Sequence, residues 1–460
     1  MGASYLIGML LFAWSCVRSA WPALRLRALG GKTRLGLIAL CCLLLCCLLR
    51  IQLTATDQVA RSLLHLSTYA SGFPIPMIGA GFLYSADVDA PRAMIIEVAA
   101  TAEALILLLL GAMLVFNAGH EKLITGILTA TAAALAALAL FAPAMESADL
   151  YSYVGLALTP QPYHPAAYVL PGDAAVINRL WGLPILPSPY GPLWLALSRV
   201  VVAMAPTLGT KLFAFRVVEL VSIAVALVML RMLGASRPAI VLFALNPAVY
   251  DLFVTEGHND MLGVTLILAA MWARKRSLIL AVALATAAGL IKLPLAFIAM
   301  TVFVAEPTLL RRLVLGFAPA LLATLVSFLA GGSAFLWALH RVYAVYATAS
   351  TPFDSSLHVA LAGLAILALL VALTTGRFIR GAVYAMPALG HFPLAQYLAW
   401  SFPFALREHE PDTLFLAALP VAVYLLNTDY AMNPFFIVVR SLLVIGSVGA
   451  LLVAWRRRRP

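Results

Sequence analysis

The chain has 460 residues, of which 63% are hydrophobic and only 11% are charged. Soluble domains carry about 25% charged residues, and a water-soluble fold cannot bury this much apolar surface. The composition therefore excludes a soluble enzyme, a DNA-binding protein and a disordered chain. It predicts an all-α polytopic membrane protein.

The net charge of +11 comes from clusters of Lys and Arg that each flank an apolar stretch. Cytoplasmic loops of membrane proteins are enriched in these residues, so we expect the clusters to face the cytoplasm and not to bind nucleic acid. Most of the acidic residues then fall on the external side. The basic clusters lie at 18–34, 274–276, 311–312, 377–380 and 456–459.

The apolar stretches predict about 13–15 transmembrane segments, because a span needs roughly 20 residues and fewer where it is broken. With the N-terminus outside, 54–92 and 144–190 become external loops. Segment 190–206 is short and bounded by Pro, which favours a re-entrant or interfacial helix. Full spans are expected at 3–20, 35–53, 93–116, 122–143, 210–233, 238–254, 259–273, 313–330, 357–374, 412–428 and 434–455, and broken pairs at 277–291/294–306 and 380–392/394–407.

The external loop 144–190 begins with two acids three residues apart, Glu146 and Asp149. A carboxylate at a membrane surface can have a raised pKa and act as a general base. The alternative is that both acids cap a helix and stay solvated. Tyr190 follows within a Pro-rich stretch, 187–194, which predicts a rigid turn or a loop anchor with interfacial aromatics.

A second polar cluster lies between the spans predicted at 238–254 and 259–273. Glu256, His258, Asn259 and Asp260 place four polar groups within five residues, together with a Gly. This density is unusual next to lipid, and the group could bind a metal, a phosphate or a sugar. The alternative is a capped helix start, with Asn259 or Asp260 as the N-cap.

Lys292 is an isolated cation in a long apolar run, just before Pro294. A helix break there would leave backbone N–H groups and a positive charge at one point, which suits a phosphate. The alternative is a structural ion pair, with Glu256 or Asp260 supplying the anion.

Two further polar groups are more ambiguous. Gln396, Tyr397 and Trp400 share one helix face, where they either serve the site or simply pack. Arg216 and Glu219 are three residues apart, a spacing that favours an ion pair within the span at 210–233.

Six short motifs follow one another in the chain: DLYSY at 149–153, QPYHP at 161–165, SPYGPLW at 188–194, NP…GHND at 246–260, KLP at 292–294 and QYLAW at 396–400. In this order they resemble the motifs of the polyprenyl-phosphomannose-dependent alpha-mannosyltransferases of the GT-C superfamily. The resemblance covers roughly 145–405. Two positions depart from the family's pattern: Ala148 precedes Asp149 where the family usually reads RDVYSY, and Gln161 replaces the Asn of NPY.

This resemblance implies an inverting transfer of a sugar, with mannose expected, from a polyprenyl phosphate to an acceptor hydroxyl. Asp149 matches the position of the family's base, and Glu146 is its neighbour. Neither a metal nor another cofactor is expected. The candidates for binding the donor phosphate or sugar are His258, Lys292, Arg179, Asn259, Asp260, Glu256, Tyr151, Tyr153, Tyr190, Gln396 and Tyr397.

The expected partners are a polyprenyl-phosphate sugar donor, a glycolipid or lipid-linked glycan acceptor, and membrane lipids. We expect a multi-pass protein of a bacterial plasma membrane, with its site on the periplasmic or extracellular side. Its parts would be N-terminal helices at 1–143, an external catalytic loop at 144–190 and a bundle with a donor-lipid groove at 191–460.

Two other classes remain open. A transporter or flippase of lipid-linked sugars predicts polar groups at the bilayer midplane and an internal repeat. A polymerase or ligase of lipid-linked glycans predicts large loops rich in Arg and His. The polar groups gather mostly at one face of the membrane, which favours a transferase.

Overall fold

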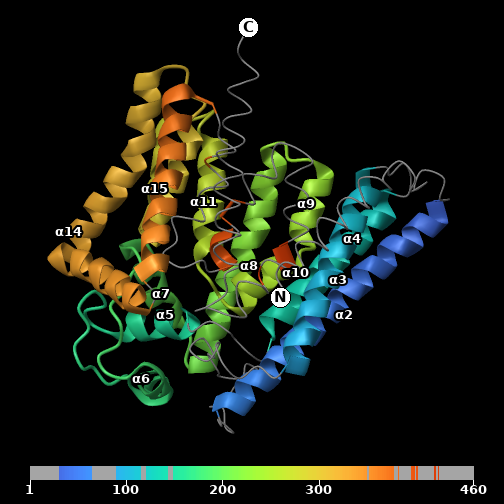
Figure 1. Ribbon diagram of the computed structural model, residues 1–460, viewed down its shortest axis with the longest axis horizontal. Helices are drawn as coiled ribbons and strands as arrows, with labels where there is room; N and C mark the ends of the chain where they lie inside the picture. The colour runs from blue at the N-terminus through green and yellow to red at the C-terminus, as the bar shows by residue number, and fades with distance from the viewer. Residues whose placement is uncertain are drawn as a thin grey trace.

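The computed structural model describes residues 31–64, 90–115, 121–142, 149–349, 352–377, 382, 395–398, 400–401, 419–420 and 423. In this part of the chain every regular element is a helix, and no strand is present (Figure 1). The spans predicted at 3–20, 412–428 and 434–455 lie outside the described residues or almost entirely so, as do most of 380–392 and 394–407. Glu146 also lies outside them.

The N-terminal helices follow the predicted spans, with one exception in length. α3 (Ala90–Val115) and α4 (Glu121–Leu140) match the stretches expected at 93–116 and 122–143. α2 (Gly31–Leu64) begins near the predicted 35 but continues past the predicted end at 53 into the segment 54–92, which was expected to be an external loop. They pack along one another and share core side chains such as Leu45, Leu107 and Leu135, all fully buried. Burial of these apolar side chains against each other fixes the group as one unit of the bundle.

The predicted external loop carries three short helices: α5 (Asp149–Leu158), η2 (Gly172–Ala174) and α6 (Ala175–Trp181). α7 (Pro192–Met204) follows and has 13 residues, which is too short for an ordinary span. It agrees with the short helix predicted at 190–206. α8 (Leu208–Met232) then runs the length of the bundle (Figure 1).

The next predicted span, 238–254, is not one straight helix. α9 (Arg237–Ala244) is followed by α10 (Pro247–Tyr250) and a π-helical turn, η3 (Asp251–Thr255), and the two halves are bent by 54°. Pro247 has no N–H to donate to the preceding turn, which ends the first helix there.

The break predicted at Lys292 is confirmed. α11 (Asp260–Ala273) leads to α12 (Leu278–Ile291), which is followed by α13 (Leu293–Ala299) and η4 (Met300–Phe303). Lys292 itself has extended backbone angles, φ −150° and ψ 118°.

The span predicted at 313–330 lies within the first part of a longer helix, before a kink. α14 (Leu309–Ala349) has 41 residues and a kink at Gly332, whose φ of +58° is outside the helical region. A residue with a side chain would be strained there. α15 (Pro352–Thr375) and the short α17 (Ala395–Leu398) complete the described elements.

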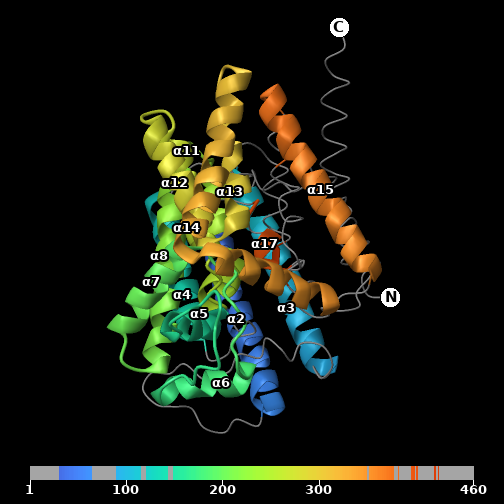
Figure 2. The ribbon, with the colours of Figure 1, turned by 90° about the vertical axis from the view of Figure 1, so that its left-hand side faces the viewer.

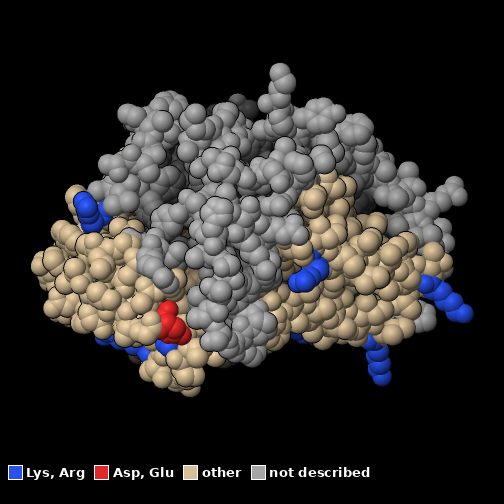
Figure 3. All heavy atoms as spheres, turned by 90° about the horizontal axis from the view of Figure 1, so that it is seen from below, with Lys and Arg blue, Asp and Glu red and all other residues tan. Residues whose placement is uncertain are grey.

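Four described helices are long and apolar enough to cross a membrane, or five if the bent pair 237–255 counts as one span. The long apolar helices expose large hydrophobic side chains, for example Leu321, Leu325 and Leu329 of α14. Seen from below, the described surface carries few charged side chains (Figure 3). The fold is therefore that of an all-α polytopic membrane protein, and the full count of spans stays a prediction.

The two ends of the bundle differ in character. α5 and α6 lie at one end, and the basic links between α8 and α9, between α11 and α12 and before α14 lie at the other (Figures 1 and 2). Ion pairs hold the basic end together: Arg237 with Glu121, and both Arg274 and Arg311 with Glu306. The described part of the predicted external loop and the predicted cytoplasmic clusters at 274–276 and 311–312 are thus at opposite ends.

Candidate active site

Asp149 is the first residue of α5. A carboxylate in the first turn of a helix is stabilised by the unpaired backbone N–H groups there. Within the same helix, the Ser152 hydroxyl donates to the backbone carbonyl of Asp149 at 2.8 Å. The Tyr153 hydroxyl, one turn along, donates to the Asp149 carboxylate at 3.4 Å.

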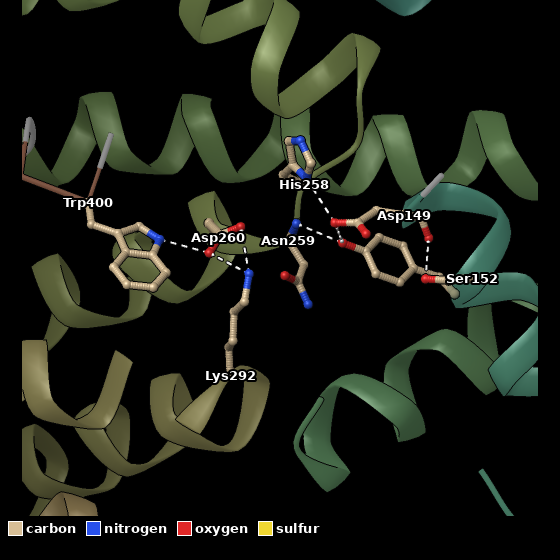
Figure 4. Close-up of polar contacts among 8 residues, drawn as sticks. Asp149, Ser152, His258, Asn259, Asp260, Lys292 and Trp400 are labelled. Carbon is tan, nitrogen blue, oxygen red and sulfur yellow. Dashed lines mark hydrogen bonds and ion pairs between the residues drawn. The ribbon is translucent and has the colours of Figure 1, made fainter. Parts of the chain in front are cut away.

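His258 approaches the same carboxylate from a distant part of the chain. Its Nδ1 lies 2.8 Å from Oδ2 of Asp149, across 109 positions of sequence (Figure 4). Gly257 makes this approach possible, since its φ is +67° and a Cβ added there would lie 2.1 Å from a methyl carbon of Leu150. Only glycine meets both requirements. The loop before α11 is therefore packed directly onto the start of α5.

The pKa of Asp149 is lowered, not raised as the sequence led us to expect. Burial raises it, but the hydrogen bond and charge of His258, the charge of Lys292 and a hydrogen bond from Tyr190 hold it below the ordinary 3.8. Asp149 is therefore ionised at neutral pH. Its side chain is 27% exposed, so the carboxylate is within reach of a bound substrate.

A second charged pair lies beside the first. Lys292 Nζ lies 3.0 and 3.2 Å from the two carboxylate oxygens of Asp260, whose side chain is fully buried. The Trp400 indole N–H donates to the same carboxylate at 2.7 Å, and Nζ lies 4.8 Å from the centre of the Tyr397 ring. The sequence left two interpretations of Lys292 open, a contact for a phosphate and a structural ion pair. The ion pair is present, and its anion is Asp260.

Asn259 lies between the Asp149–His258 pair and the Asp260–Lys292 pair. Its backbone N–H donates to the Tyr153 hydroxyl at 3.2 Å, which continues the chain of contacts from Asp149. Its side chain is fully buried, and neither amide atom has a hydrogen-bond partner among the described residues. Asn259 occupies the N-cap position of α11, yet its side chain makes no capping bond. Figure 4 shows the amide turned into the space between Lys292 and the Asp149 side of the site.

The remaining candidates divide by location. Tyr190 packs edge-on against Tyr153, with ring centres 5.2 Å apart. Tyr151, Glu256 and Gln396 are buried. In the sequence they lie within four residues of Tyr153, His258 and Trp400, respectively. Arg179 lies in α6, and its side chain is outside the described part of the structure.

Arg216 is a structural residue that sequence reasoning misassigned. Its guanidinium is fully buried and donates to three backbone carbonyls, those of Leu140, Ala142 and Thr255, at 2.9–3.2 Å. The expected ion pair with Glu219 is not formed between these two described residues. Instead Arg216 caps the end of α4 and the end of η3, the two segments that lead to Asp149 and His258.

Trp400, for which the sequence left open either a role in the site or simple packing, hydrogen-bonds Asp260. The available signal was its indole N–H, which needs a partner when buried. Among the described residues, no three His, Cys, Asp or Glu side chains form a cluster suited to a metal ion.

Comparison with known families identifies the family of this chain. A family model described as alpha-(1->6)-mannopyranosyltransferase, N-terminal domain, matches residues 77–307, half of the chain. The match includes Asp149, the segment 256–260 and Lys292. No curated relative and no solved structure matches the chain. The chain therefore belongs to the alpha-(1->6)-mannopyranosyltransferase family and is a multi-pass membrane mannosyltransferase of the GT-C type.

Proposed function

We propose that this mannosyltransferase takes mannose from a polyprenyl-phosphate donor and transfers it, with inversion, to a hydroxyl of a glycolipid or lipid-linked glycan on the external face of a bacterial plasma membrane. The observation that carries the proposal is the pairing of Asp149 with His258 directly beside that of Asp260 with Lys292. One pair offers an ionised base, and the other offers a cation near it.

Asp149 is the proposed base. It removes the proton from the acceptor hydroxyl while that oxygen forms a bond to the anomeric carbon of mannose. The bond from this carbon to the donor phosphate breaks, and its electron pair stays on the phosphate oxygen. The leaving group is already a stable anion, so the protein needs only to hold and neutralise it.

Lys292 is the proposed contact for that phosphate, with His258 assisting and Arg179 as a further candidate. An ammonium group has three donors, and Asp260 is the only carboxylate that the described structure pairs with Lys292. The buried amide of Asn259 has no partner among described residues, so it is suited to a hydroxyl of the donor sugar. The break between α12 and α13 would form part of a groove for the lipid chain within 191–460, while 144–190 would act as the catalytic loop and 1–143 as the N-terminal helices.

A donor comparison tests the proposal. The purified protein should transfer mannose to a mannoside acceptor from synthetic polyprenyl-phosphate mannose and not from a nucleotide-linked mannose. Use of the nucleotide donor would contradict the assignment. Passage of lipid-linked sugar across sealed vesicles, without a new glycosidic bond, would favour the flippase instead.

The orientation can be tested by labelling single cysteines in a background without the five native ones. Val169 lies between α5 and α6 and is 63% exposed, and Lys275 is exposed in the basic link between α11 and α12. We expect an impermeant thiol reagent to label Val169→Cys in intact cells and Lys275→Cys only after permeabilisation. The reverse pattern would place the site in the cytoplasm and overturn the proposal.

The acid side of the pH profile should report on His258. Because the pKa of Asp149 is lowered, its carboxylate stays ionised and activity should be nearly flat from about pH 8 to about pH 5. His258→Asn keeps a hydrogen-bond donor near the carboxylate but removes the electrostatic contribution of the imidazole, which helps to lower the pKa of Asp149. The pKa of Asp149 should therefore rise, and activity should fall at a higher pH than in the wild type. An acid limb that does not move would show that His258 does not tune the base.

A further inference from the structure

A separate cavity of about 510 Å³ lies between the loop after α5, helix α7 and the kink of α14. Both ribbon views place this loop beside the kinked end of α14 (Figures 1 and 2). The volume is within the range of about 300–1,000 Å³ that is usual for small-ligand pockets. Its lining includes Gln161, Tyr163, His164, Ala196, Arg199 and Gly331.

Small side chains on α14 leave room for this cavity. Its α14 wall is made of Ala330, Gly331 and Ala334, none of which has a side chain larger than a methyl group. A Cβ on Gly331 would lie 2.7 Å from the ring of Tyr163, so that ring can lie against α14 only because the position is glycine.

The chemistry of the lining fits a neutral sugar. Proline and aromatic rings offer flat apolar faces for the C–H side of a sugar ring, while an amide and a guanidinium offer hydrogen bonds to its hydroxyls. The His164 ring is held against Trp337 at 4.7 Å, and Arg199 is anchored through one N–H to the carbonyl of Pro160 at 3.4 Å. Gln161, His164 and Arg199 are exposed, and no lining residue is acidic.

One lining residue of the cavity, Tyr163, is connected to the candidate active site through Tyr190. The Tyr163 hydroxyl donates to the backbone carbonyl of Tyr190 at 3.2 Å, and the ring of Tyr190 packs against Tyr153. Tyr153 in turn hydrogen-bonds Asp149. Three successive contacts therefore link the lining of the cavity to the proposed base.

We infer that the cavity is an acceptor subsite, which binds a mannose residue of the acceptor glycan beyond the one that reacts. This inference rests on the proposed transfer to a glycan. It predicts that acceptors of two or three mannose residues bind more tightly than a single mannoside, because only the longer ones fill the cavity.

Ala196→Phe tests the inference, since Ala196 is exposed on α7 and its enlarged side chain would fill the cavity. Val200→Phe is the matched control, because Val200 is 55% exposed on the same helix and does not line the cavity. With an alpha-(1->6)-linked mannose trisaccharide acceptor, Ala196→Phe should raise the acceptor KM about tenfold and remove the advantage over a monosaccharide. Val200→Phe should keep that advantage.

A binding measurement without donor separates this inference from the proposed function. Saturation-transfer NMR should detect the free trisaccharide on the wild type, on Val200→Phe and on Asp149→Asn, and not on Ala196→Phe. This binding pattern without any transfer would contradict the proposed function but still support the subsite. Equal binding to all four proteins, or an effect of Ala196→Phe on the donor KM alone, would refute the subsite.

Discussion

Asp149→Asn should lower turnover by about 10²-fold or more, which is the usual size of the effect of a positioned general base. The amide has the shape of the carboxylate and can still accept the hydrogen bond that now joins it to His258, so the fold and donor binding should persist. Transfer rate, donor KM and thermal stability, measured on the same purified protein, separate these effects.

Glu146→Gln is the control for this substitution, because Glu146 is the other acid at the start of the same loop. We expect it to retain most of the activity. If Asp149→Asn were fully active and Glu146→Gln inactive, the base would be Glu146.

Lys292→Met should have the second large effect, and the structure shows why a single variant is not enough. Removing the ammonium leaves the fully buried carboxylate of Asp260 without its cation. Breaking one partner of a buried pair costs about 3–5 kcal/mol. Loss of folded protein is therefore expected whether or not Lys292 binds phosphate.

The double variant Lys292→Met with Asp260→Asn resolves the two roles. Neutralising Asp260 removes the orphaned charge, and its amide can still accept from Trp400, so thermal stability should largely return. If Lys292 holds the donor phosphate, the donor KM should remain at least about tenfold raised. Recovery of both stability and a normal donor KM would make Lys292 purely structural.

Much of this architecture could be predicted from the sequence because helices and their breaks are local. Hydropathy located α3, α4 and α8 to within a few residues, and Pro294 correctly indicated the break at Lys292. The continuation of α14 beyond Gly332 was missed, since this second part is less uniformly apolar and the kink depends on the backbone of Gly332.

The contacts within the site could not be predicted, because they join positions that are far apart in sequence. His258 is 109 residues from Asp149, and Trp400 is 140 residues from Asp260. Hydrophobic periodicity says which face of a helix is buried, but not which polar group meets it from another helix. The same limit explains Arg216, whose partners are carbonyls at two distant helix ends.

Asn259 shows how one residue fits two sequence interpretations. It does occupy the N-cap position, as the capping interpretation expects, but its amide turns away from the helix and into the site. Only the direction of the side chain distinguishes a cap from a ligand-binding group, and that direction depends on how α5 and α11 pack.

The stereochemistry of the product tests the central claim most directly. A single displacement assisted by Asp149 inverts the anomeric carbon, so a β-linked polyprenyl-phosphate mannose must give the alpha-(1->6) link named in the family description. The one-bond coupling constant between the anomeric carbon and its hydrogen differs between alpha- and β-linked mannose. NMR during turnover measures it for both donor and product. We predict an alpha product from the β-linked donor and no reaction with the alpha-linked one. An alpha product from an alpha-linked donor would mean retention, which would contradict the role of Asp149 as a base in a single displacement.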